Sequence, residues 1–491
     1  MRHTALTPVC LKYERKYSVH MKSYEIAAGI KPSKRQLEWQ KTEFYGFVNL
    51  GLPTVVNREW TDGKVDPVNF IPEKFDAEEW VTFFKAAGLK GMVLNVKHHD
   101  GFCLWCSELT DYTIEKSVNW ETDNRDMVKM LSEECARQGL KFGIAISPLD
   151  RNAECYGTGE EYNEYFKKLL REILTKYGDI FYVRFDGAAE DNGSGYTQEY
   201  DWEGYYEVVR ECQPDAVIAL VGPDVRWYGN EWGVIRKNEW SVVPKYFSIE
   251  EAIKRSKEPQ SKKTRKRDEK HDMDLGSRKA IKKETEFIWY PCEVSVSMRD
   301  RWYYHKEDEY SAKTKDRLQK LYLESVGANC ALMLGIPPMK DGSFSEMDYQ
   351  ILMAFGKSLR QSYNYKVSGI AEISASSSLS EEFSVQNLLN SDEDKTWKPA
   401  KNDTEPEIIF DFKEKDMFDK VLMMENIANG QHIESYELFI DKGDGKFKRV
   451  DKGGIVGYKR IHKITPVEVK RVKVKITSFR GELEMQEVTL Y

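Results

Sequence analysis

The sequence predicts an α/β protein in which a (β/α)8 barrel of the TIM type is followed by an all-β sandwich. Its 491 residues exceed what a single hydrophobic core usually fills. Strand-like apolar runs alternate with amphipathic segments from residue 44 to about residue 336, which is typical of repeated β-α units. After about residue 365 only short alternating runs remain. We therefore expect an N-terminal extension (1–35), a barrel (36–362) and a sandwich (366–491).

The number of strand-like runs matches the strand count of a TIM-type barrel. In order they are Phe44–Asn49, Gly91–Lys97, Lys141–Ser147, Ile180–Asp186, Ala216–Gly222, a weak one at Val234–Trp240, Phe287–Tyr290 and Ala331–Ile336. A doubly wound open sheet would alternate in the same way. No GxGxxG or Walker loop follows the first run, however, which argues against the nucleotide-binding open sheets.

The segments between these runs have the amphipathic spacing of helices. They are Asp76–Ala87, Asp123–Gln138, Glu160–Tyr177, Trp202–Cys212 and Ala312–Val326. Glycine follows four of them, at Gly88, Gly139, Gly178 and Gly327, where a left-handed conformation would close the helix.

The C-terminal segment has no helix-period stretch of similar length. Its runs EIIFDF (407–412), KVLMMENI (420–427), SYELFI (435–440) and RVKVKITSF (471–479) are separated by Gly, Asp and Asn. This pattern predicts antiparallel strands packed as a sandwich.

Charge and hydropathy exclude several classes of protein. The formal net charge is −7, which argues against nucleic acid or an anionic membrane as the main partner. The basic stretch 254–283 is interrupted by acids and has few aromatic residues, so we interpret it as a solvated insertion rather than a nucleic-acid patch. No apolar run is long enough for a membrane span.

The N-terminus and the cysteines bear on the compartment. The first 23 residues contain no apolar stretch typical of a signal peptide, so we expect a cytoplasmic protein, or a periplasmic or secreted one whose leader has been removed. The eight cysteines are scattered, which is typical of a reducing compartment. Cys103 and Cys106 form a Cys-x-x-Cys pair without a second pair to complete a zinc site, so we expect them to pack rather than bind metal.

Polar residues follow several predicted strands, where the reacting groups of a barrel stand. Asn49 ends the first, His98, His99 and Asp100 follow the second, and Arg184 and Asp186 end the fourth. Arg226 and Glu231 follow the fifth. Asp186 and Glu231 supply the two carboxylates that glycoside hydrolysis needs.

A metal site built on the two histidines is the alternative, with Glu59 or Asp100 as further ligands. Adjacent residues on an extended strand point to opposite faces, so both rings would seldom bind one ion. We therefore expect recognition of sugar hydroxyls, no metal and no cofactor.

The chain shares long sequence motifs with a known family. It contains, in order, QLEWQKTEFYGFVNLG, NREWTDG, NVKHHDGFCLW, FGIAISPLDRN, RFDGA, GPDVRWYGNEW, DLGSR, WYPCEVSVSMRDRWYYHKED and GIPPMKDG. Over roughly residues 36–340 it resembles glycoside hydrolase family 29, the α-L-fucosidases, and most of all the branch acting on α-1,3- and α-1,4-linked fucose. The tail, with SASSSLSEEFSVQNLLNSDEDKTW and GYKRI, resembles the discoidin or coagulation-factor type C domains, the family 32 carbohydrate-binding modules.

This resemblance implies a retaining exo-glycosidase that acts on terminal α-linked L-fucose, or a related L-sugar, of glycans. It makes Asp186 the nucleophile and Glu231 the general acid/base. It assigns sugar contacts to His98 and His99 and puts Glu59 and Trp60 beside the same ring. The remaining expected substrate contacts, in matching motifs or at altered positions, are Asn49, Arg184, Arg226, Glu293 and Trp302.

Four positions depart from the family pattern, which usually has His at Asn49, Trp at Arg184 and Leu149, and Asn at Gly335. Arg184 precedes Asp186 by two residues, so both side chains should lie on one face of their strand. A guanidinium in place of an apolar wall favours a sugar with a polar C5 substituent, such as α-L-galactose or an acidic sugar. A weak or inactive glycan-binding homologue is the alternative.

Overall fold

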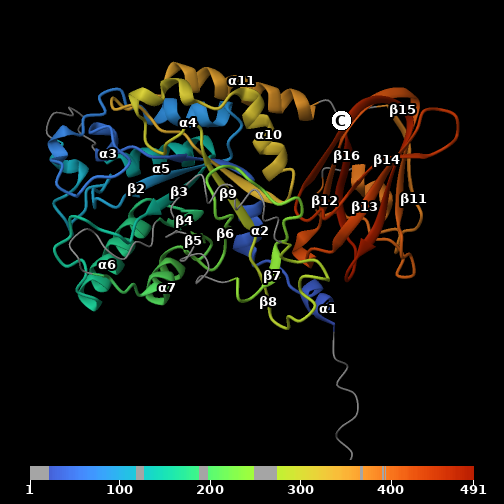
Figure 1. The fold of residues 1–491 in the computed structure, drawn as a ribbon, viewed down its shortest axis with the longest axis horizontal. Helices are drawn as coiled ribbons and strands as arrows, with labels where there is room; N and C mark the ends of the chain where they lie inside the picture. Colours follow the sequence, from blue (N-terminus) through green and yellow to red (C-terminus); the bar gives the residue numbers. More distant parts are fainter. Residues whose placement is uncertain are drawn as a thin grey trace, which may run out of the picture.

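Two domains make up the part of the chain that the computed structural model describes, which is residues 22–117, 126–186, 197–247, 274–364, 369–389, 392 and 394–491. In Figure 1 the barrel and its helices are coloured from blue to the orange-gold of the last helix, and the C-terminal domain is coloured orange to red. Most of the predicted N-terminal extension (1–21) and of the basic insertion (254–273) lies outside the described residues. Among the described residues, no helix is long and apolar enough to cross a membrane.

The first domain is an eight-stranded parallel barrel, as the sequence predicts. The strands are β1 (Phe44–Val48), β2 (Gly91–Lys97), β3 (Lys141–Ile146), β4 (Tyr182–Phe185), β5 (Val217–Leu220), β6 (Arg226–Trp227), β9 (Cys292–Ser297) and β10 (Cys330–Gly335). They lie in the order β5-β4-β3-β2-β1-β10-β9-β6. A bridge between Ala219 and Val225 brings the two edges of the sheet together, so the barrel is nearly closed.

Two of the predicted barrel strands were wrong. Val234–Trp240 is not a strand, and Phe287–Tyr290 contributes β8 (Phe287–Trp289), which pairs antiparallel with β7 (Val242–Pro244) in a separate two-stranded sheet. The true sixth strand, β6, has only two residues and therefore no readable period. The true seventh, β9, is fully buried yet carries polar residues at alternate positions, so it does not resemble an apolar run.

The helices around the barrel agree closely with the predicted segments. They are α4 (Ala77–Ala86), α5 (Met127–Gln138), α6 (Glu160–Lys176), α7 (Trp202–Cys212) and α10 (Lys315–Ser325). Gly88, Gly139 and Gly178 have φ of 87°, 71° and 73°, which confirms their role in closing helices. Gly327 does not have a positive φ, so that prediction was wrong, and the left-handed residue nearby is Asn329, with φ of 68°.

Several short elements and one long helix were not predicted. The long helix is α11 (Glu346–Asn364), which lies across the top of the barrel in Figure 1. The short ones are α1 (Ser23–Ala28), α2 (Lys34–Gln40), α3 (Leu52–Val55), η1 (Pro67–Asn69), η2 (Ile114–Lys116) and η3 (Lys306–Ser311).

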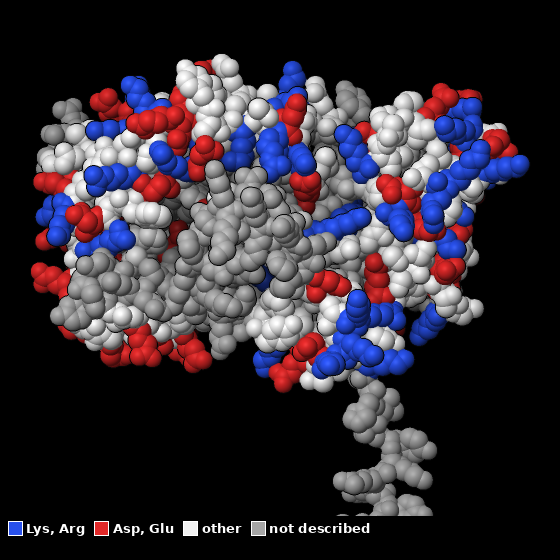
Figure 2. Space-filling view, in the orientation of Figure 1, with Lys and Arg blue, Asp and Glu red and all other residues white. Residues whose placement is uncertain are grey.

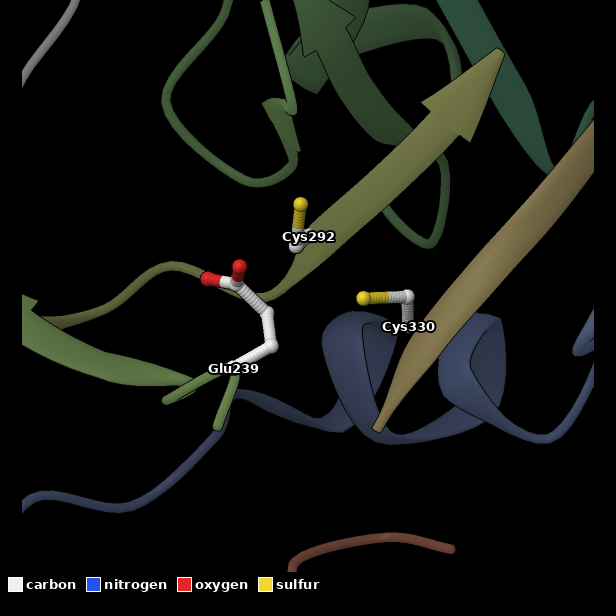
Figure 3. A group of neighbouring side chains, drawn as sticks. All are labelled: Glu239, Cys292 and Cys330. Atoms are coloured by element: carbon white, nitrogen blue, oxygen red, sulfur yellow. The ribbon is translucent and has the colours of Figure 1, made fainter. Parts of the chain in front are cut away.

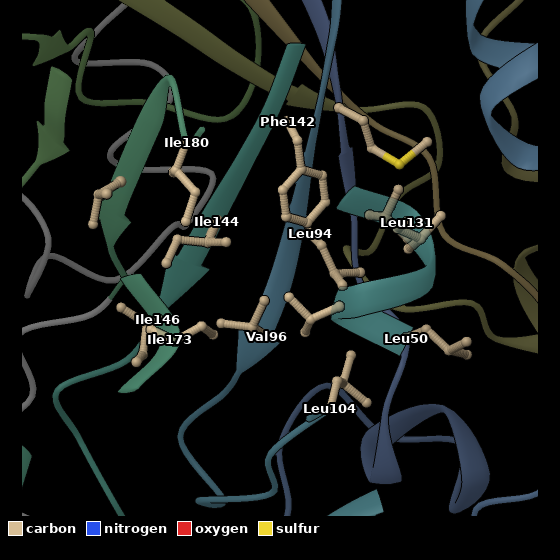
Figure 4. Packing of buried hydrophobic residues seen from close by; sticks show 14 of the residues in the cluster. Leu50, Leu94, Val96, Leu104, Leu131, Phe142, Ile144, Ile146, Ile173 and Ile180 are labelled. Carbon is tan, nitrogen blue, oxygen red and sulfur yellow. The ribbon is translucent and has the colours of Figure 1, made fainter. Parts of the chain in front are cut away.

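The main core lies between the barrel strands and the surrounding helices. Val96 and Ile144 on neighbouring strands face Leu131 of α5 and Ile173 of α6, all fully buried (Figure 4). A second, smaller cluster that includes Tyr45 fills the barrel interior. These two layers hold the strand ends in fixed relative positions.

The C-terminal domain is antiparallel throughout, which confirms the predicted all-β sandwich. Its elements are β11 (Ile370–Ala375), η4 (Val385–Leu389), β12 (Glu407–Glu425), η5 (Ile427–Asn429), β13 (Ile433–Asp441), β14 (Lys448–Gly453), β15 (Arg460–Phe479) and β16 (Met485–Leu490). Register shifts interrupt the long strands β12 and β15. Because bulges bend strands, these shifts let both strands serve two parts of the sandwich.

The two domains are joined by direct backbone and side-chain contacts. Ala328 pairs with Arg460, and the backbone N–H of Tyr458 donates to Oδ1 of Asn329 at 2.7 Å. Helix α1 touches the second domain as well, because His432 lies 3.2 Å from the carbonyl oxygen of Ala28. The sandwich is therefore packed on the barrel rather than tethered to it.

Candidate active site

A cavity of about 550 Å³ lies at the carboxyl ends of the barrel strands. It gathers most of the site residues that the sequence predicts. Those lining it are Asn49, Glu59, Trp60, His98, His99, Arg184, Asp186, Glu231 and Trp302. Side chains from strands far apart in the sequence thus meet in one place, as expected for the carboxyl face of a barrel.

Asp186 and Arg184 enter the cavity from the end of β4. Nε of Arg184 lies 3.9 Å from Oδ1 of Asp186, so the two side chains share one face of the strand, as predicted. Arg184 is buried, whereas Asp186 keeps a side-chain exposure of 23%. The carboxylate of Asp186 therefore lies beside a permanent positive charge and stays accessible from the cavity.

Glu231 lies in the loop after β6 and comes from the other side of the cavity. The loop is fixed by Asn230, whose Oδ1 accepts from the backbone N–H of Trp232 at 3.0 Å. Burial raises the pKa of Glu231, and the charge of Asp186 raises it further, while a hydrogen bond from the Trp302 side chain opposes the rise. The two carboxyl groups therefore have different environments, which is the condition for separate acid and nucleophile roles.

The two histidines stack on each other at the end of β2. Their ring centroids are 4.0 Å apart with an interplanar angle of 27°. The expectation of opposite faces was wrong because both residues follow the strand, just after a register shift between Asn95 and Lys97. Burial lowers the pKa of His98 well below its ordinary value and that of His99 to about 4. Neutral rings, each with one donor and one acceptor nitrogen, are suited to sugar hydroxyls.

Glu59 has a positioning role in this geometry. Its carboxylate accepts from the backbone N–H groups of Trp302 and Tyr303, each at 3.1 Å. It therefore holds the segment that carries Trp302 over the cavity. Trp60 stands beside it with 61% exposure, at the open side of the site.

The carboxylates considered as metal ligands are engaged with the protein. Besides the bonds of Glu59, Asp100 accepts from Thr61 Oγ1 at 2.9 Å and from the backbone N–H of Phe102 at 3.1 Å. Cys103 is buried and Cys106 partly buried, and neither forms a disulfide. These contacts explain both carboxylates without an ion.

Arg226 and Glu293 do not line the cavity. Arg226 is buried and donates from Nη2 to Glu239 at 2.5 Å. Glu293 is buried in the barrel interior, where it accepts from Arg184 at 2.8 Å and from the Tyr182 hydroxyl at 2.5 Å. Glu293 therefore lies behind Arg184 rather than beside a bound sugar.

One further group of possible metal ligands occurs in the described part of the chain, formed by Glu239, Cys292 and Cys330 (Figure 3). Their ligand atoms lie within 4.8 Å of one another. Both carboxylate oxygens of Glu239 already accept from arginines, one from Arg226 and the other from Arg236. Two guanidinium groups at the same carboxylate disfavour a cation, so we interpret the group as a buried ion-pair cluster.

Several lining residues were not predicted from the sequence. They are Phe47, Leu220, Trp227, Trp232, Asp300, Arg301 and Tyr303. Their chain positions carried a usable signal, since most lie within two residues of a predicted site residue. Phe47, for example, lies on β1 two positions before Asn49, which directly follows that strand.

The four departures from the family pattern are interior positions. Asn49 accepts from the side-chain amide of Asn95 at 2.8 Å and lines the cavity together with Arg184. Leu149 is buried but is not part of the lining. Gly335 lies beneath Trp302, whose ring would be 2.6 Å from a Cβ at that position.

The carboxyl face of this parallel barrel holds an Asp and a Glu in different environments, among histidines and aromatic side chains. This arrangement is typical of a glycoside hydrolase. Comparison with known sequences agrees, since the family profile described as alpha-L-fucosidase matches residues 34–363 and that of the F5/8 type C domain matches residues 372–487. The chain belongs to the α-L-fucosidase family, glycoside hydrolase family 29, which confirms the resemblance.

Individual relatives agree with this assignment over nearly the whole chain. Alpha-L-fucosidase 1 of Arabidopsis thaliana is 33% identical over 94% of this chain and 87% of its own length. A solved putative α-L-fucosidase from Bacteroides ovatus has a TM-score of 0.80 at 35% identity, covering 95% of this chain and 75% of that one. A Ruminococcus gnavus family 29 fucosidase, solved in complex with fucose, has a TM-score of 0.81 at 26% identity and covers 94% of this chain and 95% of its own.

Proposed function

We propose that this glycoside hydrolase removes terminal α-linked L-fucose, or a closely related L-sugar, from glycans with retention of configuration. The observation that carries the proposal is the presence of Asp186 and Glu231 in one cavity, with the pKa of Glu231 raised mainly by burial. A retaining hydrolase needs one ionised carboxylate and one carboxylic acid at the same bond.

Asp186 is the nucleophile in this proposal. Its carboxylate attacks the anomeric carbon and forms a glycosyl ester while the bond to the leaving oxygen breaks. Glu231 donates its proton to that oxygen and then removes a proton from the water that hydrolyses the ester. A raised pKa suits Glu231 because it must hold a proton before the first step.

The rest of the cavity binds the sugar. His98, His99 and Asn49 offer neutral hydrogen-bonding groups for ring hydroxyls. Phe47, Trp227 and Trp302 offer apolar surface for the carbon face of the ring. Trp60, which is largely exposed, is available to the leaving group, which is the part of the glycan beyond the terminal sugar.

A second candidate substrate is an α-L-galactoside or an acidic L-sugar. It is favoured by Arg184, whose buried Nε makes no hydrogen bond to any other described residue. A substrate oxygen near this donor would satisfy it, and an unsatisfied buried donor costs about 1–3 kcal/mol. A 6-hydroxyl or carboxylate can provide such an oxygen, whereas the methyl group of fucose cannot.

The test is hydrolysis of aryl α-L-fucoside and α-L-galactoside by the wild type and by Asp186→Ala. A fluorinated donor of the preferred sugar should add one sugar mass to the wild type, located on the peptide that contains Asp186. Asp186→Ala should hydrolyse nothing and remain unlabelled. If the wild type hydrolysed neither aryl nor branched substrates but bound the glycan tightly, this would instead support an inactive glycan-binding homologue.

A further inference from the structure

The segment that follows β3 is bonded to the end of β2 and to the two histidines after it. The backbone N–H of Ser147 donates to the carbonyl oxygen of Lys97 at 2.8 Å. Further along, the backbone N–H of Arg151 donates to the carbonyl oxygen of His99 at 3.0 Å. Because backbone bonds join the two segments at two points, the side chains of Ser147 and His99 keep a fixed separation.

A buried lysine fixes the same segment. Lys and Arg side chains are spread over the face of the molecule that Figure 2 shows, whereas Lys97 is fully buried. Its Nζ donates to the carbonyl oxygens of Ser147 at 2.9 Å and Leu149 at 3.3 Å, and it lies 3.0 Å from Oδ2 of Asp150. Lysine is rarely fully buried unless it is paired. Lys97 therefore ties the segment after β3 to the end of β2.

The hydroxyl of Ser147 lies between a backbone N–H and a histidine ring. Its Oγ accepts from the backbone N–H of Leu149 at 3.1 Å and lies 2.6 Å from Nδ1 of His99. Ser147 is fully buried, and its hydroxyl has no further hydrogen-bond partner among the described residues. Since a buried hydroxyl hydrogen needs an acceptor, it is donated to Nδ1 of His99. A neutral ring that accepts at Nδ1 carries its proton on Nε2.

The other ring nitrogen of His99 is available to a ligand. His99 lines the cavity, and its Nε2 has no hydrogen-bond partner in the described part of the chain. Burial lowers the pKa of His99 to about 4, helped by the charges of Arg151 and Lys97 and opposed by that of Asp186, so the ring is neutral at neutral pH. With its proton on Nε2, the ring offers a donor to the cavity and no acceptor.

We propose that Ser147 is a positioning residue that fixes His99 as a hydrogen-bond donor to an oxygen of the substrate sugar. This inference rests on the proposed function and deepens it, because it assigns the polarity of one sugar contact. The donor selects a sugar that directs an oxygen lone pair toward Nε2. A sugar with only hydrogen at that carbon would leave the donor unpaired. Because the ring is already held in this tautomer, substrate binding does not require it to reorder.

The first measurement is NMR of the histidine ring nitrogens in the full chain without substrate. The chain has eight histidines, and the signals of His99 are those that disappear in His99→Gln. The wild type should carry the proton of this ring on Nε2, with Nδ1 unprotonated. In Ser147→Ala the Nδ1 signal should move, because its donor is gone and the second tautomer becomes populated. A proton on Nδ1 in the wild type, or unchanged His99 signals in Ser147→Ala, would overturn the proposal.

The second measurement is kcat/KM on the preferred aryl glycoside. Ser147→Ala should lower it about tenfold, equivalent to about 1.4 kcal/mol. The matched control is Ser325→Ala, which removes another fully buried hydroxyl, bonded to the carbonyl oxygen of Leu321 in α10 and outside the cavity. It should keep the wild-type activity and the wild-type His99 signals. Equal losses of activity in the two variants would overturn the positioning role, because loss of any buried hydroxyl would then explain them.

Failure of the proposed hydrolysis can be told apart from failure of this inference. If the wild type hydrolyses no glycoside, L-fucose and L-galactose are added to the labelled protein and the Nε2 signal of His99 is followed. A shift of that signal with either sugar supports the donor contact without hydrolysis. No shift with either sugar overturns it.

Discussion

Arg184 and Glu293 form an ion pair inside the barrel, with Nη1 of the arginine 2.8 Å from Oε1 of the glutamate. They come from β4 and β9, and both are almost fully buried. The other oxygen of Glu293 accepts from the hydroxyls of Tyr45 and Tyr182, each at 2.5 Å. Glu293 thus fixes the guanidinium that faces the proposed sugar site without lining that site itself.

Replacing Glu293 by glutamine should weaken both stability and activity. The amide keeps the shape but removes the carboxylate that lies closest to the buried guanidinium of Arg184, and breaking a buried pair costs about 3–5 kcal/mol. Urea unfolding measures the first effect and kcat/KM on the preferred aryl glycoside the second. The control is Glu78→Gln, which removes an exposed pair with Arg137 and should leave both unchanged. A stable, fully active Glu293→Gln would contradict the positioning role.

Trp302→Phe should move the basic limb of the pH–activity profile to higher pH. The indole hydrogen bond stabilises the ionised form of Glu231 and holds its pKa down against burial. Without that bond the pKa rises further, and the acid form persists to higher pH. The measurement is kcat/KM against pH. Trp227→Phe also alters the cavity lining, but the indole N–H of Trp227 has no hydrogen-bond partner among the described residues, so this control should leave the limb in place.

Gly335→Ala should reproduce that shift by a different route. The new Cβ would lie 2.6 Å from the Trp302 ring and 3.1 Å from Cα of Ser297, so the ring has to move. A displaced ring should lose its bond to Glu231, and a misplacement of about 1 Å can cost about 100-fold in rate. Gly369→Ala, with its nearest neighbour at 3.6 Å, is the control. An unchanged profile in Gly335→Ala would show that the ring is free to adapt.

The fold was predictable where strands are apolar and long enough to have a period. β2 and α7 match their predicted bounds, and the other predicted helices differ by a few residues. β6 was missed because it has only two residues, and β9 was missed because it carries Glu293, Ser295 and Ser297, of which Glu293 and Ser295 belong to a polar network inside the barrel. In the sequence, a strand that carries a buried polar network resembles a loop. The partners of its polar residues, here on β4 and β1, lie far away in the chain.

The sequence predicted which residues belong to the candidate site, but not which of them line the cavity. Motif order brought Asp186, Glu231 and the two histidines together, and the cavity contains all of them. It could not distinguish a residue that lines the cavity from one that lies behind it, and Arg226 and Glu293 fall in the second group. Whether a charged residue lines the cavity depends on which residue it pairs with, and that pairing is set by the packing of the barrel.

The two histidines of the cavity should make stability depend on pH in the acid range. Burial lowers the pKa of His99 from 6.5 to about 4. Between pH 6.5 and about 4, the His99 ring therefore binds a proton in the unfolded chain but not in the folded chain. Stability is therefore lost as pH falls from 6.5 to about 4, at up to about 1.4 kcal/mol per pH unit for one proton. His99→Gln should flatten urea-derived stability over this window. Parallel pH curves for variant and wild type would contradict a neutral His99 ring in the folded protein.

Asn329 should be the most sensitive single residue at the junction of the two domains. It adopts φ of 68°, and its side chain donates to the carbonyl of Glu239 at 2.8 Å and accepts from the N–H of Tyr458 at 2.7 Å. Asn329→Gly keeps the backbone conformation but loses these bonds, which should cost about 1–3 kcal/mol. Asn329→Ala should cost about 1–2 kcal/mol more, because an L side chain resists the left-handed region. Urea unfolding with probes in each domain separates the two effects, and equal losses in both variants would mean that the junction relaxes out of this conformation.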